Sequence, residues 1–414
     1  MAKTADEMSG RSNGFMDWVD ARLPVTEFWN AHLAKYYAPK NFNIWYYFGA
    51  FSLLVMVIQI VSGIFLTMHY KPSAAEAFAS VEYIMRDVDY GWLMRYMHST
   101  GASFFFIVVY LHMFRAMLYG SYRKPRELIW VFGMLIYLLL MAEAFLGYVL
   151  PWGQMSYWGA QVIINLFGAL PVIGEPLVEW IRGDFFISDA TLNRFFALHV
   201  IALPIALLGL VVLHLTALHE TGSNNPDGIE IKAKKDENGV PLDGIPFHPY
   251  YTVKDIFGAS ILLLLFAFVI FFWPEGGGLF LEYDNFVPAN PLVTPEHIKP
   301  VWYFTPYYAI LRAVPDKLMG VLLMGAAVMI LFFLPWLDRS PVKSIRYRGA
   351  WYKILLGLFV IAFVRLGMLG MAEGTVAETW ESRLWTFVYF AFFIGLFFFS
   401  KNGATKPVPE RVTA

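Results

Sequence analysis

Residues Leu93–Leu118 read LMRYMHSTGASFFFIVVYLHMFRAML, an apolar stretch that carries His98 and His112. A histidine inside a lipid-spanning helix is costly and usually has a function. A step of fourteen residues from one histidine to the next advances a helix by about 21 Å, or nearly four turns, so both side chains lie near one face. The stretch therefore predicts a membrane helix with two functional histidines at different depths.

A second apolar stretch, Thr191–Leu218, carries His199 and His214. If the two helices pack antiparallel, the four histidines meet as two pairs, His98 with His199 and His112 with His214. Two imidazoles that face each other across a helix bundle can bind one haem iron from both sides. We therefore predict two haems at two levels of a membrane.

Composition identifies the chain as an integral membrane protein. Of its 414 residues, 58% are hydrophobic and only 15% are charged, whereas soluble domains carry roughly 25% charged residues. The net charge of -1 argues against nucleic acid as a partner. The chain has no cysteine, which excludes disulfides, iron–sulfur ligation by its own thiolates and haem attached covalently through cysteine.

Eight apolar segments have about the twenty residues that a bilayer-spanning helix needs. They are Trp45–Tyr70, Leu93–Leu118, Ile129–Val149, Thr191–Leu218, Thr252–Trp273, Leu318–Trp336, Trp351–Met371 and Leu384–Ser400. An amphipathic segment, Phe15–Leu33, predicts a helix on the membrane surface. Residues 1–22 are polar and charged, so we expect no cleavable signal peptide. The predicted fold is an all-α membrane protein in three parts: an interfacial segment (1–44), a di-haem four-helix bundle (45–220) and four further spans with long loops (221–414).

Basic residues gather in every second loop and in the C-terminal tail. They are Arg123, Lys124, Arg126, Lys232, Lys234, Lys235, Arg339, Lys343, Arg346, Arg348, Lys401, Lys406 and Arg411. If eight helices alternate in direction, the positive-inside rule places these loops and both termini in the cytoplasm. The opposite loops are longer and less basic, and apolar runs such as Val162–Leu170 predict short surface helices there. His98 and His199 then lie near the outer face, and His112 and His214 near the inner face.

Glycines and arginines accompany the histidines. Four glycines repeat the fourteen-residue step in two pairs: Gly49 and Gly63, then Gly133 and Gly147. Glycine lets a bulky planar group or another backbone approach closely, so we expect these residues to make room for the haems; ordinary helix packing is the alternative for any single one. Three arginines near helix ends can pair with haem propionates or extend to the membrane interface: Arg95, Arg115 and Arg194.

Five motifs carry a resemblance to a known family. They are RYMHSTGASFFF from Arg95, GYVLPWGQMSYWGA from Gly147, LHETGSNNPDG from Leu218, FHPYYTVKD from Phe247 and KPVWYFTPYYAILR from Lys299. With them the chain resembles cytochrome b, the membrane core of the cytochrome bc complex (complex III, quinol:cytochrome c oxidoreductase), from about Trp45 to the last span. The resemblance implies two non-covalent haem b groups, one of low potential between the outer histidines and one of high potential between the inner histidines.

The resemblance also implies a reaction and its partners. Quinol would be oxidised at the outer side, and one electron would pass to a Rieske iron–sulfur protein and then to cytochrome c1. The other electron would cross through the two haems and reduce quinone near the cytoplasm, which contributes to a proton gradient. The family further implies a homodimeric complex in membrane lipid, and the sequence departures favour a bacterial cytoplasmic membrane.

Two quinone pockets follow from the resemblance. The outer pocket, which oxidises quinol, is expected to contain Phe145, Tyr148, Met155, Gly159, Pro300, Phe304 and Tyr308, although aromatic residues in membrane helices often only pack. Glu143, near this pocket, either relays protons or hydrogen-bonds inside the bundle. In the inner pocket, His219 and Asp255 can protonate the two carbonyl oxygens of a quinone, with Ser223 and Lys254 as neighbours; a structural interfacial role is the alternative for His219.

Two positions depart from the family pattern. His199 and His214 are fifteen residues apart, which turns the second histidine about 100° further round a helix, and we expect a kink at Pro204 to absorb this error. Val301 stands where mitochondrial relatives have the glutamate of a Pro-Glu-Trp-Tyr motif, and valine cannot accept a proton. Glu296 is the candidate replacement, with a solvated loop carboxylate as the alternative.

Two other functions fit parts of the sequence. A di-haem membrane anchor of a dehydrogenase also uses helical histidine pairs, but such anchors are usually smaller and lack these motifs. A secondary transporter can have eight spans and intramembrane charges, but it would more often show repeated halves, and no internal repeat is visible. The charged insert Ile229–Asp243 is expected to be a solvated loop.

Overall fold

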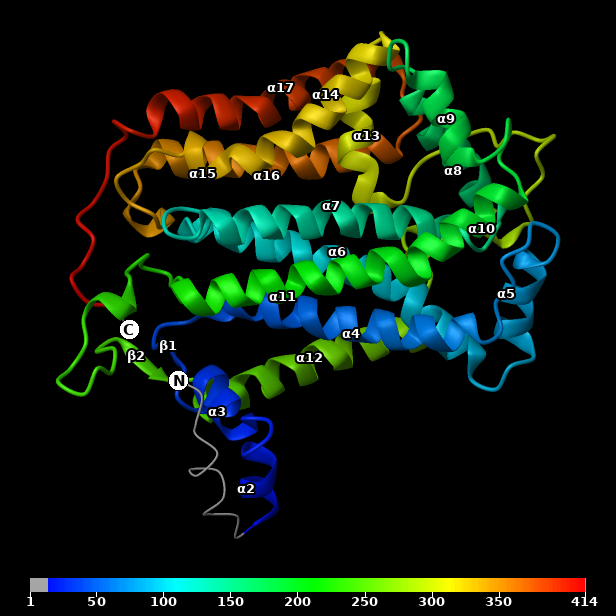
Figure 1. The fold of residues 1–414 in the computed structure, drawn as a ribbon. Coiled ribbons are helices and arrows are strands. Elements are labelled where there is room, and N and C mark those ends of the chain that lie inside the picture. Colours follow the sequence, from blue (N-terminus) through cyan, green and yellow to red (C-terminus); the bar gives the residue numbers. More distant parts are fainter. Residues whose placement is uncertain (1–13, 414) are drawn as a thin grey trace.

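The computed structural model describes residues 14–413, and this part of the chain is mostly helical (Figure 1). Among the described residues, eight helices are long and apolar enough to cross a membrane. They are Ile44–Thr67, which contains α4 (Tyr47–Thr67); α6 (Gly91–Tyr119); α7 (Glu127–Val149); Asp189–Thr221, which contains α10 (Asp189–Ala197) and α11 (Leu203–Thr221); α12 (Tyr250–Phe272); Lys317–Leu337, which contains α14 (Lys317–Met329) and α15 (Leu334–Leu337); α16 (Ala350–Met371); and α17 (Val376–Phe399). The expected all-α membrane fold with eight spans is confirmed.

The first four spans form a bundle that carries all four paired histidines. α4 packs along α6, and α7 packs along α11, and the four helices run side by side (Figure 1). A second group forms where α13 (Thr305–Arg312) packs against α16, and α16 against α17. Large apolar side chains on the outside of the spans, such as Leu264 and Phe272 on α12, are exposed. Such an apolar outer surface is what contact with lipid tails requires.

The span that carries His199 contains a local irregularity. Leu198–Ala202 form a π-helical turn between α10 and α11, and Pro204 follows in the first turn of α11. A π-bulge adds a residue to a helical turn, which accommodates the fifteen-residue step to His214. We expected a kink at Pro204 to correct the helical phase between His199 and His214. Instead, the π-helical turn around His199 makes this correction.

Short helices occupy the two ends of the molecule. At one end of the bundle, here called the outer end to distinguish it from the opposite, inner end, lie α5 (Ala77–Arg86), α8 (Gln154–Phe167) and α9 (Gly174–Arg182) (Figure 1). At the other end lie α2 (Phe15–Asp20), α3 (Val25–Trp29) and an antiparallel pair of short strands, β1 (Tyr37–Pro39) and β2 (Gly244–Pro246). The surface helices expected in the long loops are therefore present, and the expected amphipathic segment divides into two short helices at Pro24.

The insert 229–243 is anchored, which differs from the fully solvated loop expected. Its middle, residues 232–239, is exposed. Its last residue, Asp243, is buried and lies 2.7 Å from Arg411 Nε and 3.0 Å from Lys40 Nζ. The hydrogen bond from Arg411, with help from Lys40, lowers the pKa of Asp243 to about 2. The insert thereby joins the N-terminal segment to the C-terminal tail at the inner end.

A buried ion pair lies within the loop 338–349 at the inner end, and a hydrogen bond from Tyr122 links it to the loop after α6. Arg348 Nη2 lies 2.5 Å from Asp338 Oδ2, and Tyr122 Oη donates a hydrogen bond to the same carboxylate oxygen at 2.5 Å. The two charged side chains are 1% and 0% exposed. Removal of either one would leave the other charge buried without a partner, which is far more costly than the loss of an exposed pair.

Asp338→Ala is expected to destabilise the folded protein by about 3–5 kcal/mol, because Arg348 stays buried without its counter-charge. The matched control, Glu76→Ala, removes one partner of the exposed Lys71–Glu76 pair and should cost less than about 1 kcal/mol. Unfolding of both variants in detergent micelles compares the two losses. Small and equal losses of unfolding free energy in the two variants would show that the buried pair does not stabilise the inner loops.

Candidate functional site

The four histidines meet as two pairs across the bundle. His98 and His199 have ring centres 6.1 Å apart with ring planes at 87°, and His112 and His214 have ring centres 6.4 Å apart with ring planes at 67°. Imidazole nitrogens bind metals at about 2 Å, so two rings on opposite sides of one ion have centres roughly 6 Å apart. Each pair therefore has the spacing that axial ligation of one metal ion requires.

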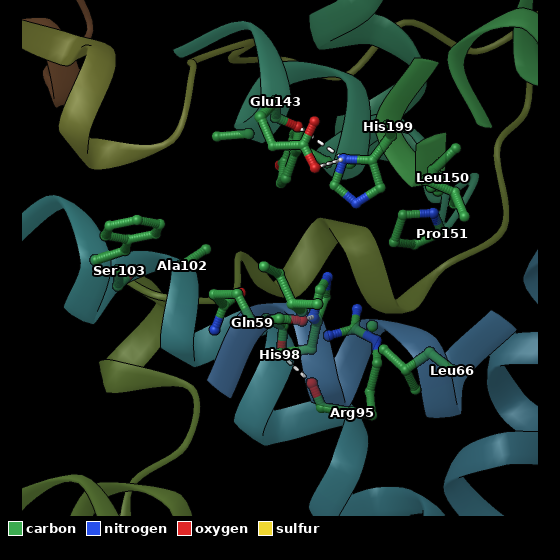
Figure 2. Close-up of a pocket in the computed structure, with 18 of the residues that line it drawn as sticks. Gln59, Leu66, Arg95, His98, Ala102, Ser103, Glu143, Leu150, Pro151 and His199 are labelled. Atoms are coloured by element: carbon green, nitrogen blue, oxygen red, sulfur yellow. Dashed lines mark hydrogen bonds and ion pairs between the residues drawn. The ribbon is translucent and has the colours of Figure 1, made fainter. Parts of the chain in front are cut away.

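Groups on the neighbouring helices orient the outer imidazoles, which point toward each other in Figure 2. His199 Nδ1 lies 2.9 Å from the carbonyl oxygen of Glu143 and 3.0 Å from its carboxylate. His98 Nδ1 lies 3.1 Å from the carbonyl oxygen of Gln59 and from Ser62 Oγ. An imidazole whose Nδ1–H donates to a carbonyl leaves Nε2 free to bind a metal. Of the two roles considered for Glu143, its contact with His199 supports hydrogen bonding within the bundle.

Each of the four glycines faces one of the histidines. A Cβ atom added to Gly147 would lie 2.4 Å from Cε1 of His199, and one added to Gly63 would lie 3.0 Å from Cε1 of His98. The corresponding inner contacts are Gly49 to His112 at 3.2 Å and Gly133 to His214 at 3.4 Å. The glycines therefore give room to the imidazole rings, and that they also make room for the haems stays a prediction.

One mostly apolar cavity extends from the outer histidine pair into the bundle and towards the loop before α13 (Figure 2). Its lining includes Arg95, His98, Tyr148, His199 and Val301. Pockets of this kind, apolar with a few polar groups, commonly bind lipophilic small molecules. The outer histidine pair thus shares one continuous space with Tyr148, one of the residues predicted for the quinol pocket.

The residues predicted for the outer pocket are only partly brought together. Tyr148 lines the cavity, and a Cβ atom on Gly159 would lie 3.9 Å from its ring. The others lie outside the lining: Phe145 packs against Phe195, Met155 is buried in α8, Phe304 packs against Phe106, Tyr308 lies under the guanidinium of Arg312, Pro300 precedes Val301, and Glu296 is exposed. Any role of these residues in quinol binding stays a prediction.

The three arginines lie in different surroundings. Arg95 lines the outer cavity beside His98. Arg115 Nη2 donates to the carbonyl oxygen of Asn224 at 2.8 Å. Arg194 is exposed and donates to the carbonyl oxygen of Trp180 at 2.7 Å. Among the three, Arg95 is the one whose position next to the outer histidine pair fits the predicted pairing with a propionate.

At the inner end, His219 contacts a residue of the segment before α4. The ring centre of Tyr36 lies 4.8 Å from that of His219, and Tyr36 Oη lies 3.4 Å from Ser223 Oγ. Two of the residues predicted for the inner pocket therefore surround the same tyrosine. Tyr36 directly precedes β1, so the pairing of β1 with β2 brings it to the end of α11.

Asp255, the carboxylate predicted for the inner pocket, also contacts this segment. Tyr46 Oη donates a short hydrogen bond to Asp255 Oδ1. Lys254, its neighbour in the chain, lies with Nζ 5.0 Å from the ring centre of Tyr251. Tyr36 and Tyr46 were not candidates in the sequence, because tyrosines are common at membrane interfaces and only the tertiary fold places these two beside His219 and Asp255.

A loop carboxylate contacts Tyr148 at the outer cavity. Tyr148 Oη donates a hydrogen bond to Glu282 Oε2 at 2.9 Å, and Glu282 is only 5% exposed. Burial raises the pKa of Glu282 to about 7, although its hydrogen bonds and the charge of Lys299 act in the opposite direction. Nothing in the local sequence distinguishes Glu282 from an exposed loop carboxylate such as Glu296, so sequence reasoning missed it.

Two family models match the chain. One is described as "Cytochrome b/b6/petB" and matches residues 33–222, and the other is described as "Cytochrome b(C-terminal)/b6/petD" and matches residues 288–390. The first contains the four histidines and the second contains the loop before α13 and most of the last three spans. Together the two matched regions include all the residues predicted for the outer pocket and His219 of the inner pocket, whereas Ser223, Lys254 and Asp255 lie outside them.

Whole-chain relatives give the same result. The protein named "Cytochrome b" from Allochromatium vinosum is 60% identical, over 98% of this chain and 100% of the relative. That from Rickettsia bellii is 49% identical, over 100% of each chain. A solved structure described as "Hyperthermophilic respiratory Complex III" has a TM-score of 0.86 and 40% identity, over 92% of this chain and 98% of that chain. The chain therefore belongs to the cytochrome b family.

Proposed function

We propose that this chain is the di-haem membrane subunit of a quinol:cytochrome c oxidoreductase. The observation that carries the proposal is the two imidazole pairs, with ring centres 6.1 and 6.4 Å apart, in one apolar bundle. His98 and His199 would bind the outer, low-potential haem b, and His112 and His214 the inner, high-potential one. Bound there, haem supplies one-electron redox chemistry. Family membership over nearly the whole chain favours this function over a dehydrogenase anchor or a transporter.

The chain's own residues would orient the ligands and exclude water. The backbone carbonyls of Gln59 and Glu143 hold the Nδ1 sides of the outer imidazoles, so that both Nε2 atoms stay available. Arg95 lies where a guanidinium can pair with a propionate at the outer level, and Arg115 is the candidate at the inner level. The glycines opposite the rings keep each imidazole close to the neighbouring helix.

Quinol would be oxidised in the outer cavity, beside Tyr148 and Val301. One electron would leave through a Rieske iron–sulfur protein and cytochrome c1, and the other would cross the bundle towards the inner histidine pair. The similarity to a chain of a respiratory complex III supports this assignment. We further propose a homodimeric complex in a bacterial cytoplasmic membrane, with both termini on the cytoplasmic side because the basic loops lie there.

Quinone would be reduced at the inner end, between α11 and the start of α12. His219 and Asp255 would donate protons to the two carbonyl oxygens of the quinone. Tyr46 donates to Asp255 and would keep its carboxylate in place, and Ser223 would add a hydroxyl near His219. Lys254 would contribute positive charge at the membrane surface.

A reduced-minus-oxidised absorption spectrum of the purified protein tests the proposal. We expect two distinguishable b-type signals, with about two haems per chain. His199→Leu should remove the outer signal and His214→Leu the inner one, because each change deletes one axial ligand. The matched control His248→Leu, in the exposed loop before α12, should retain both signals. A complete absence of haem from the unchanged protein would refute the proposal.

Gly147→Ala tests whether the glycines position the ligands. The added methyl group would lie 2.4 Å from Cε1 of His199, so the ring must move, and we expect the haem content to fall to roughly half because only the outer site is disturbed. Gly209→Ala is the control, because a Cβ atom there has nothing within 4 Å. The haem-to-protein ratio measures both variants. Equal haem content in the two would contradict the proposed role.

Asp255→Asn tests the inner pocket. Asparagine can accept the hydrogen bond from Tyr46 but cannot donate a proton as an acid, so we expect re-oxidation of the inner haem by added quinone to slow at least ten-fold. Reduction through the outer pocket should keep its rate. Asp236→Asn, in the exposed insert, is the control. Normal re-oxidation in the Asp255 variant would remove this carboxylate from the reaction.

A further inference from the structure

Glu282 is a buried carboxylate in a surface loop. It lies between α12 and α13, directly before the short helix Tyr283–Phe286. Its neighbours Tyr283 and Asp284 are exposed, whereas Glu282 itself is 5% exposed. A carboxylate is rarely buried unless it is paired or has a function, and no positive charge is within ion-pair distance of this one among the described residues. Its burial therefore needs an explanation.

The partner of Glu282 is the hydroxyl of Tyr148. Tyr148 Oη donates to Glu282 Oε2 at 2.9 Å. Tyr148 lines the outer cavity together with Val301 and Tyr303, and Glu282 lies outside that lining, behind the tyrosine. Tyr148 therefore borders the space that a molecule in the cavity would occupy, and Glu282 does not. The geometry is that of a two-step hydrogen-bond relay from the cavity to the loop.

The burial of Glu282, together with the charges around it, favours proton exchange near neutral pH. Burial raises the pKa of Glu282 to about 7, and the nearby carboxylate of Asp284 adds to this effect. The hydrogen bond from Tyr148 and the positive charge of Lys299 act in the opposite direction, and Tyr303 is the other titratable group facing it. A group with a pKa near the working pH is an efficient proton acceptor.

We propose that Glu282 is the proton acceptor for quinol oxidation in the outer cavity and that Tyr148 carries the proton to it. A quinol hydroxyl gives its proton to Tyr148 Oη while the original Tyr148 proton moves to Glu282 Oε2. The quinol O–H bond breaks, a carboxylic O–H bond forms, and the tyrosine is unchanged. After Glu282 passes this proton towards the solvent, the second quinol proton follows the same path, so that two protons leave with the two electrons. The electrons go to the one-electron acceptors of the proposed function, a haem and an iron–sulfur protein, on which this inference rests.

Two features favour Glu282 over the other positions. Val301 lines the cavity and is 5% exposed, but its side chain cannot accept a proton. Glu296 is exposed and lies outside the cavity lining. A proton acceptor needs a contact with the cavity and a way to release the proton to solvent. Glu282 has both, because it reaches the cavity through Tyr148 and lies close to the exposed Asp284, from which a proton can pass to the outer solvent.

The test compares Glu282→Gln with Glu296→Gln and with the control Glu179→Gln, an exposed carboxylate on α9, in the purified complex that contains this chain. Glutamine has nearly the same shape and can still accept the hydrogen bond from Tyr148, but it cannot accept a proton. Oxidation of a short-chain benzoquinol, with cytochrome c as the final acceptor, should slow at least ten-fold in the Glu282 variant. The Glu179 variant should keep the parent rate, and a loss of rate in Glu296→Gln with none in Glu282→Gln would overturn the inference.

The pH profile separates proton transfer from a structural role. In the unchanged protein the rate should fall as the pH drops below about 7, because protonated Glu282 cannot accept a further proton. This fall should be absent in Glu282→Gln and present in Glu282→Asp, which keeps a carboxylate. A Glu282→Gln variant with the parent rate and the parent pH profile would overturn the inference.

A double-mutant cycle tests the relay itself. If Tyr148 passes the proton to Glu282, the combined Tyr148→Phe and Glu282→Gln protein should be no slower than the slower single variant, because each change interrupts the same path. Multiplied losses would overturn the relay. If Glu282→Gln fails to assemble, the pH profile of Tyr148→Phe decides, since it should also lose the fall below about pH 7.

The haem spectrum distinguishes this inference from the proposed function. Unchanged protein without haem signals would refute the function as a whole. Normal haem signals together with an unaffected Glu282→Gln rate would refute only the role of Glu282. Normal signals with a slowed rate and an altered pH profile are the results that the relay requires.

Discussion

Two imidazoles must stay roughly 6 Å apart to bind one metal ion between them, and here this spacing has to hold twice inside an apolar bundle. Three features of the chain maintain this spacing between the imidazole rings. Glycines such as Gly147 let the rings approach the neighbouring backbone, and carbonyl groups such as that of Glu143 orient them. The π-helical turn Leu198–Ala202 sets the direction of His199 relative to His214. A change in any of these moves one ring and leaves its partner in place.

The outer cavity connects this electron path to proton chemistry. If quinol is oxidised there as proposed, a mostly apolar lining favours release of its protons through side chains of the protein. Valine at position 301 keeps this part of the cavity wall apolar, and under our proposal the proton acceptor, Glu282, lies outside the lining. The contact between Tyr148 and Glu282 restores a path, because the loop that carries Glu282 also borders the solvent. The inner pocket differs in this respect, because its proposed proton donor, Asp255, lies directly at the end of a span.

The sequence predicted most features that depend on composition and spacing. Apolar length was enough for the eight spans, the similar steps between the histidines of two spans (fourteen and fifteen residues) were enough to pair them, and the fourteen-residue steps singled out the glycines. Features that arise from tertiary contacts were not predicted or were predicted only in part. A proline kink was expected where a π-helical turn lies, and Glu282 looked like any loop carboxylate because its burial depends on α7. The anchoring of the 229–243 insert likewise needs Lys40 and Arg411, which are distant in the chain.

An experimental density map of the purified protein would test the paired-ligand arrangement most directly. We expect a flat macrocycle between His98 and His199 and a second between His112 and His214, each with its iron about 2 Å from both imidazole nitrogens. Lipid or detergent between the rings, or ring pairs too far apart to share one ion, would contradict the arrangement on which the proposed electron path depends.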